Sequence, residues 1–292
     1  MQDLIAKANT LLEALPYIQR FSGQIFVVKY GGSFMDSPDP TIRHGVARDI
    51  VFLEAVEINP VVIHGGGKAI TRAMEAAGLK ATFIQGQRVT DEATVNLVEH
   101  VLSREINPEV VETINKLGGR AKGFAGTDIF KCRQLFLTGA DGEKLDIGFV
   151  GEVTHVNVEP LLACLQEGFT PVISPTARGE TDGKIYNCNA DVAAAQAAIA
   201  LHASRLVFMS DVPGLMRDPN DFSTVIPQLR ISEVPSLKAA GIVDKGMIPK
   251  VDSAVSAIRA GIHKVSLVDG RIPHAVLLEI FTDAGVGTEV VP

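Results

Sequence analysis

Apolar residues along most of the chain fall alternately into short continuous runs and helical stripes. Runs such as IFVVKY (residues 25–30) and PVVIHG (residues 60–65) are bounded by glycine or proline, which is typical of buried strands. Between them, residues 41–57 have the apolar period of a helix, and the same rhythm returns from residue 159 onward. This alternation predicts an α/β fold in which a mainly parallel sheet carries helices on both faces.

Two stretches depart from this rhythm. Residues 128–157 contain short β-rich runs separated by glycine and aspartate, which predicts hairpins. Residues 177–188 also read as a hairpin or a loop. We expect a domain joint near residues 175–185.

The N-terminal segment has a helical apolar pattern but is too short to have a core of its own. Pro16 is expected to end this helix at Leu15, because a proline inside a helix removes a hydrogen bond. The helix must therefore pack on the body of the protein or on another subunit. Its apolar stripe consists of Leu4, Ile5, Ala8, Leu11, Leu12 and Leu15.

Two helix ends can be assigned from residue type. Gly78 is expected to follow the last turn of the helix that begins near Lys68, where a left-handed conformation favours glycine. Thr90 is predicted to cap the next helix, with Asp91 and Glu92 in its first turn.

Composition narrows the class of protein. The chain has 292 residues, of which 46% are hydrophobic and 21% charged, as in soluble globular proteins of one large or two moderate domains. Its formal net charge of −7 argues against a nucleic-acid binder but does not exclude small anionic ligands, because local basic clusters can oppose the global sign.

Cysteine usage and the N-terminal sequence indicate a compartment. Cys132, Cys164 and Cys188 are widely spaced and odd in number, which fits reduced thiols and offers no zinc site. Residues 1–20 do not resemble a signal peptide, and no apolar stretch approaches the ~20 residues that a membrane span needs. We expect a cytoplasmic protein that binds neither membrane nor nucleic acid.

Two glycine turns follow the predicted strands, in FVVKYGGS (residues 26–33) and in HGGGKA (residues 64–69). Neither matches the P-loop or the dinucleotide-binding fingerprint. Both lie at the carboxyl ends of strands, where open α/β sheets bind ligands, and glycine lets successive amides approach phosphate oxygens. Each turn alone could be a plain tight turn. Together, and with Lys29 beside the first, they favour a phosphate site.

Three other motifs carry candidate chemistry, although each has an ordinary structural explanation. Arg88 in GQRVTD could be an ordinary solvated surface charge, or its planar guanidinium could bind a carboxylate in two hydrogen bonds. In YNCNAD (residues 186–191), Asn187 or Asn189 could cap the following helix, and Asp191 either suits its dipole or holds catalytic lysines. Lys250 precedes a helix in GMIPKV and could equally face solvent.

These pieces share one chemical requirement. Phosphoryl transfer needs positioning and neutralisation of charge, which two lysines, glycine-turn amides and Mg²⁺ carried by the nucleotide would supply. No cluster of histidine, cysteine and aspartate has metal-ligand spacing, and no Ser-His-Asp order stands out, so we expect no dedicated metal site.

Taken in order, KYGGS, VVIHGGGKAI, GQRVTD, YNCNAD, SDVPGL and GMIPKV resemble the amino acid kinase family over residues 25–292. More narrowly, GQRVTD and the YN-x-NAD spacing resemble the branch that uses ATP to phosphorylate the side-chain carboxylate of N-acetyl-L-glutamate in arginine biosynthesis. The resemblance implies a three-layer α/β/α sandwich with a helical arm over residues 1–22. It also implies an N-acetylglutamate-binding half over 23–178 and an ATP-binding half over 179–292.

The resemblance also implies site roles. Lys29 would stabilise the migrating phosphoryl group, Lys250 the leaving ADP, and Asp191 would orient both lysines. Arg88 would clamp a substrate carboxylate and Asn187 would bind the amino-acid end. Backbone amides for the phosphoryl oxygens and the substrate would come from Gly31, Gly32, Gly65, Gly66 and Gly67, and the nucleotide would be surrounded by Ser210, Asp211, Gly246 and Met247.

A subtype is suggested by both ends of the chain. The arm with Tyr17 resembles the helix by which arginine-sensitive members interlace dimers into a hexamer, and Glu279 and Gly285 match positions that bind the inhibitor arginine. Two positions depart from the pattern: Ser266 stands where many such members have histidine, and Lys245 where a glycine is usual. A P-II signalling protein is a further possible partner of this subtype.

Two other functions remain open at this point. A glutamate 5-kinase would share the fold, although it would not need Arg88. A non-catalytic arginine sensor would be expected to have lost the lysines and Asp191, which this chain retains.

Overall fold

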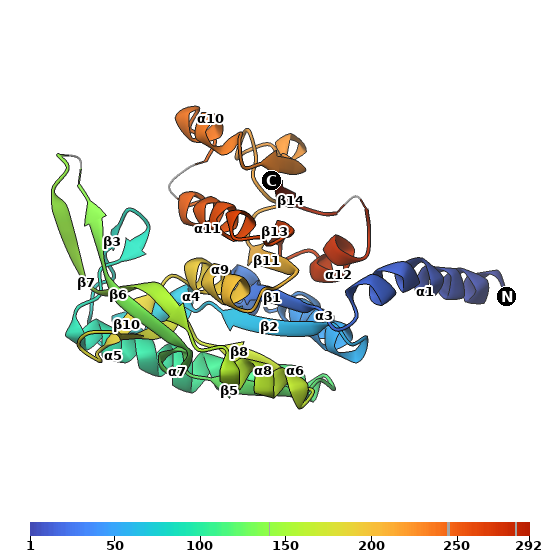
Figure 1. Ribbon diagram of the computed structural model, residues 1–292, viewed down its shortest axis with the longest axis horizontal. Helices are drawn as coiled ribbons and strands as arrows, with labels where there is room; N and C mark the ends of the chain where they lie inside the picture. The colour runs from blue at the N-terminus through green and yellow to red at the C-terminus, as the bar shows by residue number, and fades with distance from the viewer. Residues whose placement is uncertain (140, 244–245, 284) are drawn as a thin grey trace.

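A computed structural model describes residues 1–139, 141–243, 246–283 and 285–292. Its centre is an eight-stranded sheet in the order β12-β14-β13-β11-β1-β2-β8-β5 (Figure 1). Its described strand pairs are parallel except for the antiparallel pair β13–β14, so the predicted parallel sheet is confirmed. The strands are β1 (Ile25–Tyr30), β2 (Asn59–His64), β5 (Ala121–Phe124), β8 (Thr170–Ile173), β11 (Arg205–Ser210), β12 (Gln228–Arg230), β13 (Lys264–Asp269) and β14 (Thr288–Val291).

Helices cover both faces of this sheet, which confirms the three layers. Successive side chains of a strand point to opposite faces, so Val27 of β1 enters one core while Phe26 and Val28 enter the other. The first core includes α8 (Glu159–Gln166), α9 (Ala190–Ala200) and α11 (Ile248–Arg259). The second includes α3 (Gly45–Ala55), α4 (Gly67–Ala76), α5 (Glu92–Glu99), the π-helical turn η2 (His100–Ile106), α6 (Asn107–Lys116) and α12 (Ala275–Ile280).

The hairpins predicted outside the α/β rhythm are confirmed. Strands β6 (Phe130–Thr138) and β7 (Lys144–Val156) pair antiparallel, as do β9 (Thr176–Gly179) and β10 (Ile185–Cys188), and the four close into a small barrel. A further hairpin joins β3 (Phe83–Ile84) to β4 (Gln87–Arg88). The division of the chain near residue 178 stays a prediction, because the sheet runs without a break through the β1–β11 pair. The remaining short helices are η1 (Ser33–Asp36), α2 (Pro40–Arg43), α7 (Gly126–Ile129), η3 (Phe222–Thr224) and α10 (Val234–Ala239).

The N-terminal helix is longer than predicted. Helix α1 spans Gln2–Phe21 and continues through Pro16, so the expected end at Leu15 is wrong. Pro16 lacks the amide that would bond to the carbonyl of Leu12, but Leu12 is 62% exposed, and water can satisfy an exposed carbonyl. The helix projects from the body (Figure 1), and its apolar stripe is exposed from Leu4 to Leu15. Among the described residues, no helix is long and apolar enough to cross a membrane.

The helix cap predicted at Thr90 lies one residue later. Asp91 caps α5, because its carboxylate accepts a hydrogen bond from the amide of Thr94 at 2.8 Å. Thr90 is instead fully buried and bridges to β7, where its amide donates to Ile147 and its carbonyl accepts from Phe149. This isolated bridge fixes the Thr90 backbone against β7, and the Thr90 hydroxyl donates to the carbonyl of Arg88 instead of accepting from the first turn of the helix. Gly78, in contrast, has the predicted left-handed conformation, with φ 71°.

Candidate active site

A cavity of about 530 Å³ opens at the carboxyl ends of β1, β2 and β11, where neighbouring parallel strands direct their following turns to one edge of the sheet. It gathers residues from nearly the whole length of the chain. The predicted site residues that line it are Lys29, Gly31, Gly32, Gly65, Gly66, Gly67, Arg88, Asn187, Asp191, Ser210, Asp211, Gly246 and Lys250.

Asp191 lies between two lysines. The Nζ atom of Lys29 lies 3.2 Å from its Oδ1, and the Nζ atom of Lys250 lies 2.9 Å from its Oδ2. Lys29 projects from the end of β1 and Lys250 from the first turn of α11, while Asp191 is in the first turn of α9. Asn189 caps α9 by accepting hydrogen bonds from the amides of Asp191 and Val192, so one of the two predicted caps is confirmed.

The two lysines dominate the electrostatics of this group. Burial alone would raise the pKa of Asp191, but the charges of Lys29 and Lys250 outweigh it and lower the pKa to about 2. Burial also lowers the pKa of Lys250, although Asp191 counteracts this. Asp191 is therefore an anion at neutral pH, and with two cations around it the group has one net positive charge to offer to a phosphoryl group.

The two glycine turns contact each other directly. A Cβ atom on Gly31 would lie 3.0 Å from the backbone nitrogen of Gly65, so a side chain at this position would collide with the second turn. At Gly66 a Cβ atom would lie 2.5 Å from Ile106 and 2.6 Å from Leu102 in η2. Close approach thus requires glycine at these positions, and it places both turns at one end of the cavity.

The amide of Gly65 is not free for a ligand. It donates to the carbonyl of Tyr30 at 2.8 Å, and the Gly65 carbonyl lies 2.9 Å from Nδ1 of His64. The expectation that Gly65 offers its amide is therefore wrong, because tertiary pairing between the turns has already used that donor. Gly66 and Gly67 begin α4, and the first amides of a helix lack intrahelical acceptors, so these two are the donors that this turn presents.

Arg88 is a buried cation at the wall of the cavity. It is 7% exposed and donates to the carbonyl of Gly67 at 3.0 Å and to Oγ1 of Thr71 at 2.9 Å. Its guanidinium carbon lies 4.6 Å from the centre of the Phe83 ring, and burial lowers its pKa. No carboxylate forms an ion pair with it in the described part of the chain. A buried guanidinium without a carboxylate is suited to bind the carboxylate of a ligand.

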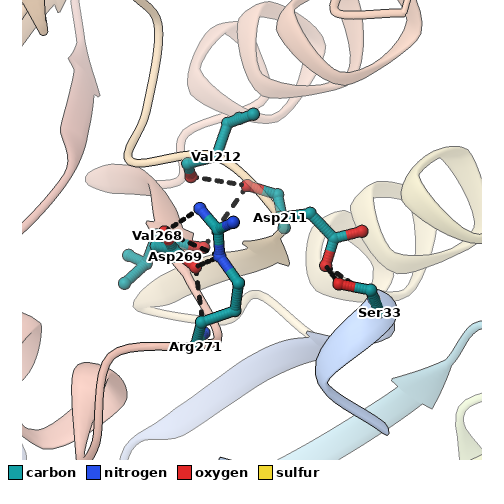
Figure 2. A network of polar contacts seen from close by, with 7 residues as sticks. Ser33, Asp211, Val212, Val268, Asp269 and Arg271 are labelled. Carbon is teal, nitrogen blue, oxygen red and sulfur yellow. Dashed lines mark hydrogen bonds and ion pairs between the residues drawn. The ribbon is translucent and has the colours of Figure 1, made fainter. Parts of the chain in front are cut away.

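The far side of the cavity joins polar residues from β10 and from the loop after β11. Asn187 lies on β10, with its Nδ2 3.5 Å from Oγ1 of Thr90. Asp211 accepts two hydrogen bonds from Ser33, which directly follows the first glycine turn (Figure 2). Ser33 was not singled out from the sequence, although its place next to Gly32 was a signal that could have identified it.

The remaining predicted site residues lie elsewhere. Met247 precedes α11 and does not line the cavity, and Lys245 lies outside the described residues. The predicted arginine-binding residues gather around α12. The Tyr17 hydroxyl donates to Asp283 at 2.6 Å, and the buried carboxylate of Glu279 accepts from Ser266 at 2.8 Å and pairs with Lys264 at 3.1 Å.

Gly285 completes this second group. A Cβ atom there would lie 2.7 Å from Oε2 of Glu279, and its φ of 62° favours glycine. The structure therefore separates two sets of predicted residues, one at the cavity and one at α12.

Known proteins are similar to this chain in sequence. The model of the amino acid kinase family matches residues 24–269. The chain is 48% identical to an acetylglutamate kinase of Geobacter metallireducens, covering 99% of each chain, and 44% identical to one of Clostridium beijerinckii, covering 97% of this chain and 98% of the other.

Solved structures show the same fold at lower identity. N-acetylglutamate synthase from Neisseria gonorrhoeae matches with a TM-score of 0.80 and 24% identity, over 98% of this chain and 63% of that one. A carbamate kinase from Giardia matches with a TM-score of 0.65 and 12% identity, over 92% and 99% of the two chains.

Proposed function

The chain belongs to the amino acid kinase family, and we propose that it transfers the γ-phosphoryl group of ATP to the side-chain carboxylate of N-acetyl-L-glutamate. The product would be N-acetyl-L-glutamyl 5-phosphate, an intermediate of arginine biosynthesis, a role that fits a cytoplasmic enzyme. The observation that carries the proposal is the Lys29–Asp191–Lys250 group in one cavity with the buried guanidinium of Arg88.

The phosphoryl transfer requires no covalent bond between the protein and either substrate. A carboxylate oxygen of the acceptor attacks the γ-phosphorus, the bond from that phosphorus to the bridging oxygen breaks, and ADP leaves. We assign to Lys29 the stabilisation of the migrating phosphoryl oxygens, and to Lys250 the charge that develops on ADP. Asp191 would keep both ammonium groups in place without touching the phosphoryl group.

The acceptor would be held by groups on the N-terminal half of the sheet. Arg88 would bind its α-carboxylate in two parallel hydrogen bonds, and Asn187 would contact the amino-acid end. The amides of Gly66 and Gly67 at the start of α4 would receive the reacting carboxylate. This arrangement would place the acceptor between Arg88 and the lysines.

The nucleotide would lie on the other side of the lysines. Its phosphates would face the amides of Gly31 and Gly32, and the rest would contact Ser210, Asp211 and Gly246, with Met247 close by. Among the described residues, no group of three histidine, cysteine, aspartate or glutamate side chains could hold a metal ion. The oxygens of Asp191 already face lysines, so Mg²⁺ would enter with the nucleotide and add charge neutralisation at its phosphates.

The acceptor can be tested by measuring ADP release with N-acetyl-L-glutamate, glutamate, aspartate and carbamate at equal concentrations. We expect clear preference for N-acetyl-L-glutamate. Preference for free glutamate would instead support a glutamate 5-kinase. A chain that binds arginine but releases no ADP with any acceptor would be a non-catalytic sensor.

We also propose that arginine inhibits the enzyme by binding near α12. Glu279 would receive its guanidinium, with Tyr17 and Gly285 beside it. An adjoining cavity of about 370 Å³ is lined by Arg20, Arg205 and Lys264, which are suited to a carboxylate. We expect arginine to inhibit the wild type and to inhibit Glu279→Gln much less. Equal inhibition of both would remove Glu279 from this role.

The exposed stripe of α1 supports an oligomer, and we propose a hexamer built as a trimer of dimers. The large apolar side chains between Leu4 and Leu15 are between 42% and 70% exposed in the single chain, so a second subunit would bury them. Sizing of the full chain and of a variant that lacks residues 1–22 tests this. An equal number of subunits per particle for the two would contradict it.

A further inference from the structure

Ser33 and Asp211 link the first glycine turn to the opposite half of the sheet. The Ser33 amide and hydroxyl both donate to Oδ1 of Asp211, at 2.5 and 2.7 Å, across 178 residues of sequence (Figure 2). Strands β1 and β11 are parallel neighbours, with Lys29 opposite Phe208, so both residues follow the carboxyl ends of adjacent strands. The contact therefore spans the two turns that would hold a nucleotide.

The position of Asp211 is itself fixed by β13. The Ser210 hydroxyl donates to the carbonyl of Val212 at 3.1 Å and lies 3.4 Å from that of Val268, and the amide of Gly270 donates to the carbonyl of Ser210 at 2.9 Å. These bonds hold the loop on both sides of the Asp211 side chain. Asp211 is thus a carboxylate on an anchored loop, not a mobile surface group.

The glycine turn is confined on its other sides as well. A Cβ atom on Gly32 would lie 2.7 Å from Oδ1 of Asp211 and 2.9 Å from the Phe34 ring. Gly31 lies against the backbone of Gly65. The turn therefore lies between the second glycine turn and the loop after β11, and the contact between Ser33 and Asp211 is what bonds it to that loop.

We propose that Asp211 is a positioning residue that acts through Ser33. Its carboxylate fixes the turn Gly31–Gly32 so that the amides of these two residues face the phosphoryl end of the nucleotide. Without the contact, the two glycines have wide conformational freedom, and binding must then order them. This inference rests on the proposed function, because it takes the cavity to be a nucleotide site.

Asparagine and alanine at position 211 distinguish a hydrogen-bond role from a charge role. Asparagine retains an oxygen that accepts both bonds from Ser33 but has no charge, whereas alanine retains neither. Removal of hydrogen bonds to a charged group typically weakens an equilibrium by roughly tenfold or more. We expect Asp211→Ala to raise the Kd of MgADP and the KM of MgATP about tenfold, with the KM of N-acetyl-L-glutamate within about twofold of wild type. Ser33→Ala removes only the hydroxyl bond and retains the amide bond, so it should raise the same two constants in the same direction but by less.

Two further results are expected from the same pair. The double variant Ser33→Ala/Asp211→Ala should bind MgADP about as weakly as Asp211→Ala alone, because Asp211→Ala already removes the hydroxyl bond that Ser33→Ala removes. Asp211→Asn should retain MgADP binding within about threefold of wild type, because its side chain still accepts from Ser33.

The chain contains a matched control in Asp221 and Ser223. Here too one carboxylate oxygen accepts from a serine amide, at 2.9 Å, and from its hydroxyl, at 2.6 Å, but this pair caps the exposed turn η3 and does not line the cavity. Ser223→Ala and Asp221→Ala should leave the Kd of MgADP unchanged. Changes there equal to those at Ser33 would mean that loss of any such cap weakens binding, which would overturn the proposal.

The decisive measurement is calorimetric titration of the full-length chain with MgADP, with thermal unfolding as a check of folding. Unchanged MgADP affinity in Asp211→Ala would show that the contact does not position the turn, and tighter affinity would show that the carboxylate competes with phosphate. Either result would overturn the proposal. Equal loss in Asp211→Asn and Asp211→Ala would do the same. If Asp211→Ala does not fold, the test uses Ser33→Ala and Asp211→Asn. Weaker MgADP binding in Ser33→Ala together with binding near that of the wild type in Asp211→Asn would support the proposal, and any other result would overturn it.

Different experimental results would contradict the proposed substrate and the proposed role of Asp211. MgADP binding needs no acceptor, so a wild type that prefers another acceptor contradicts the proposed substrate and leaves this inference standing. Normal phosphorylation of N-acetyl-L-glutamate together with unchanged MgADP binding in Asp211→Ala contradicts this inference alone.

Discussion

The Nζ atom of Lys250 lies 2.9 Å from Oδ2 of Asp191, although 59 residues separate them in the sequence. The Lys250 side chain is only 8% exposed, so its charge is held in a poorly hydrated place by one carboxylate that it shares with Lys29. Such a cation is already desolvated and oriented before a ligand arrives, which makes it effective against charge that develops during a reaction.

Removal of either lysine should therefore abolish most turnover. We expect Lys29→Ala and Lys250→Ala each to lower kcat by roughly 100-fold or more, because loss of one charge-stabilising group typically costs about 3–4 kcal/mol of transition-state stabilisation. Steady-state ADP release with saturating substrates measures this. Lys131→Ala, at an exposed position of β6, is the control. Near-normal turnover without Lys29 or Lys250 would refute the assigned role.

Asp191→Asn should change the pH dependence as well as the rate. Burial lowers the pKa of Lys250, and Asp191 is the largest influence that opposes this. Loss of the Asp191 charge should therefore let Lys250 deprotonate at a lower pH, so the residual activity should decline earlier on the alkaline side. A pH–rate profile from about 6 to 10 tests this, and a variant profile parallel to that of the wild type would contradict it.

Arg88→Ala should act on acceptor binding more than on turnover. A buried guanidinium that binds a carboxylate in two hydrogen bonds contributes roughly 2–4 kcal/mol, so the KM of N-acetyl-L-glutamate should rise about 30-fold or more while the KM of MgATP stays nearly constant. Arg133→Ala, which breaks an exposed pair with Glu152, is the matched control and should change neither constant. An unaltered acceptor KM in Arg88→Ala would place the carboxylate clamp elsewhere.

Asp49 should make stability depend on pH. This fully buried carboxylate on α3 accepts from Nδ1 of His274 at 2.8 Å and from the amide of Val276 at 3.1 Å, so it caps α12 from another part of the chain. Burial nevertheless raises its pKa to about 6, against an ordinary value of 3.8. A carboxyl group with a raised pKa stabilises the fold most below its unfolded-state pKa, and this contribution is lost as pH rises through about 6.

The test compares the wild type with Asp49→Asn, which does not titrate. The stability of the wild type relative to the variant should fall by about 3 kcal/mol between pH 4 and pH 8, since each unit of pKa shift corresponds to about 1.4 kcal/mol. Denaturant unfolding at several pH values measures this, and titrating groups that do not contact Asp49 cancel in the difference, whereas His274 contacts it directly. A difference that is constant across this range would show that Asp49 titrates normally.

Local pattern predicted the elements of this protein well where neighbours along the chain decide the outcome. The apolar runs that became β1 and β2 and the left-handed Gly78 follow from side chains within a few residues of one another. The predictions failed where a distant contact intervened. Thr90 does not cap α5 because β7 pairs with it. Pro16 does not end α1, and the turn of α1 before it, at Leu12, is exposed to water.

For the candidate site, too, some features could be predicted from the sequence and others depend on the tertiary structure. Lys29, Arg88, Asp191 and Lys250 each have an ordinary structural explanation when taken alone, and it was the order of their motifs, with its resemblance to a family, that indicated them. Their arrangement around one cavity, the amide of Gly65 already bonded to Tyr30, and the contact of Ser33 with Asp211 come from the tertiary structure. Periodicity records only which face of an element is buried. Which donors remain free for a ligand depends on how elements far apart in sequence meet at the edge of the sheet, and no local pattern carries that information.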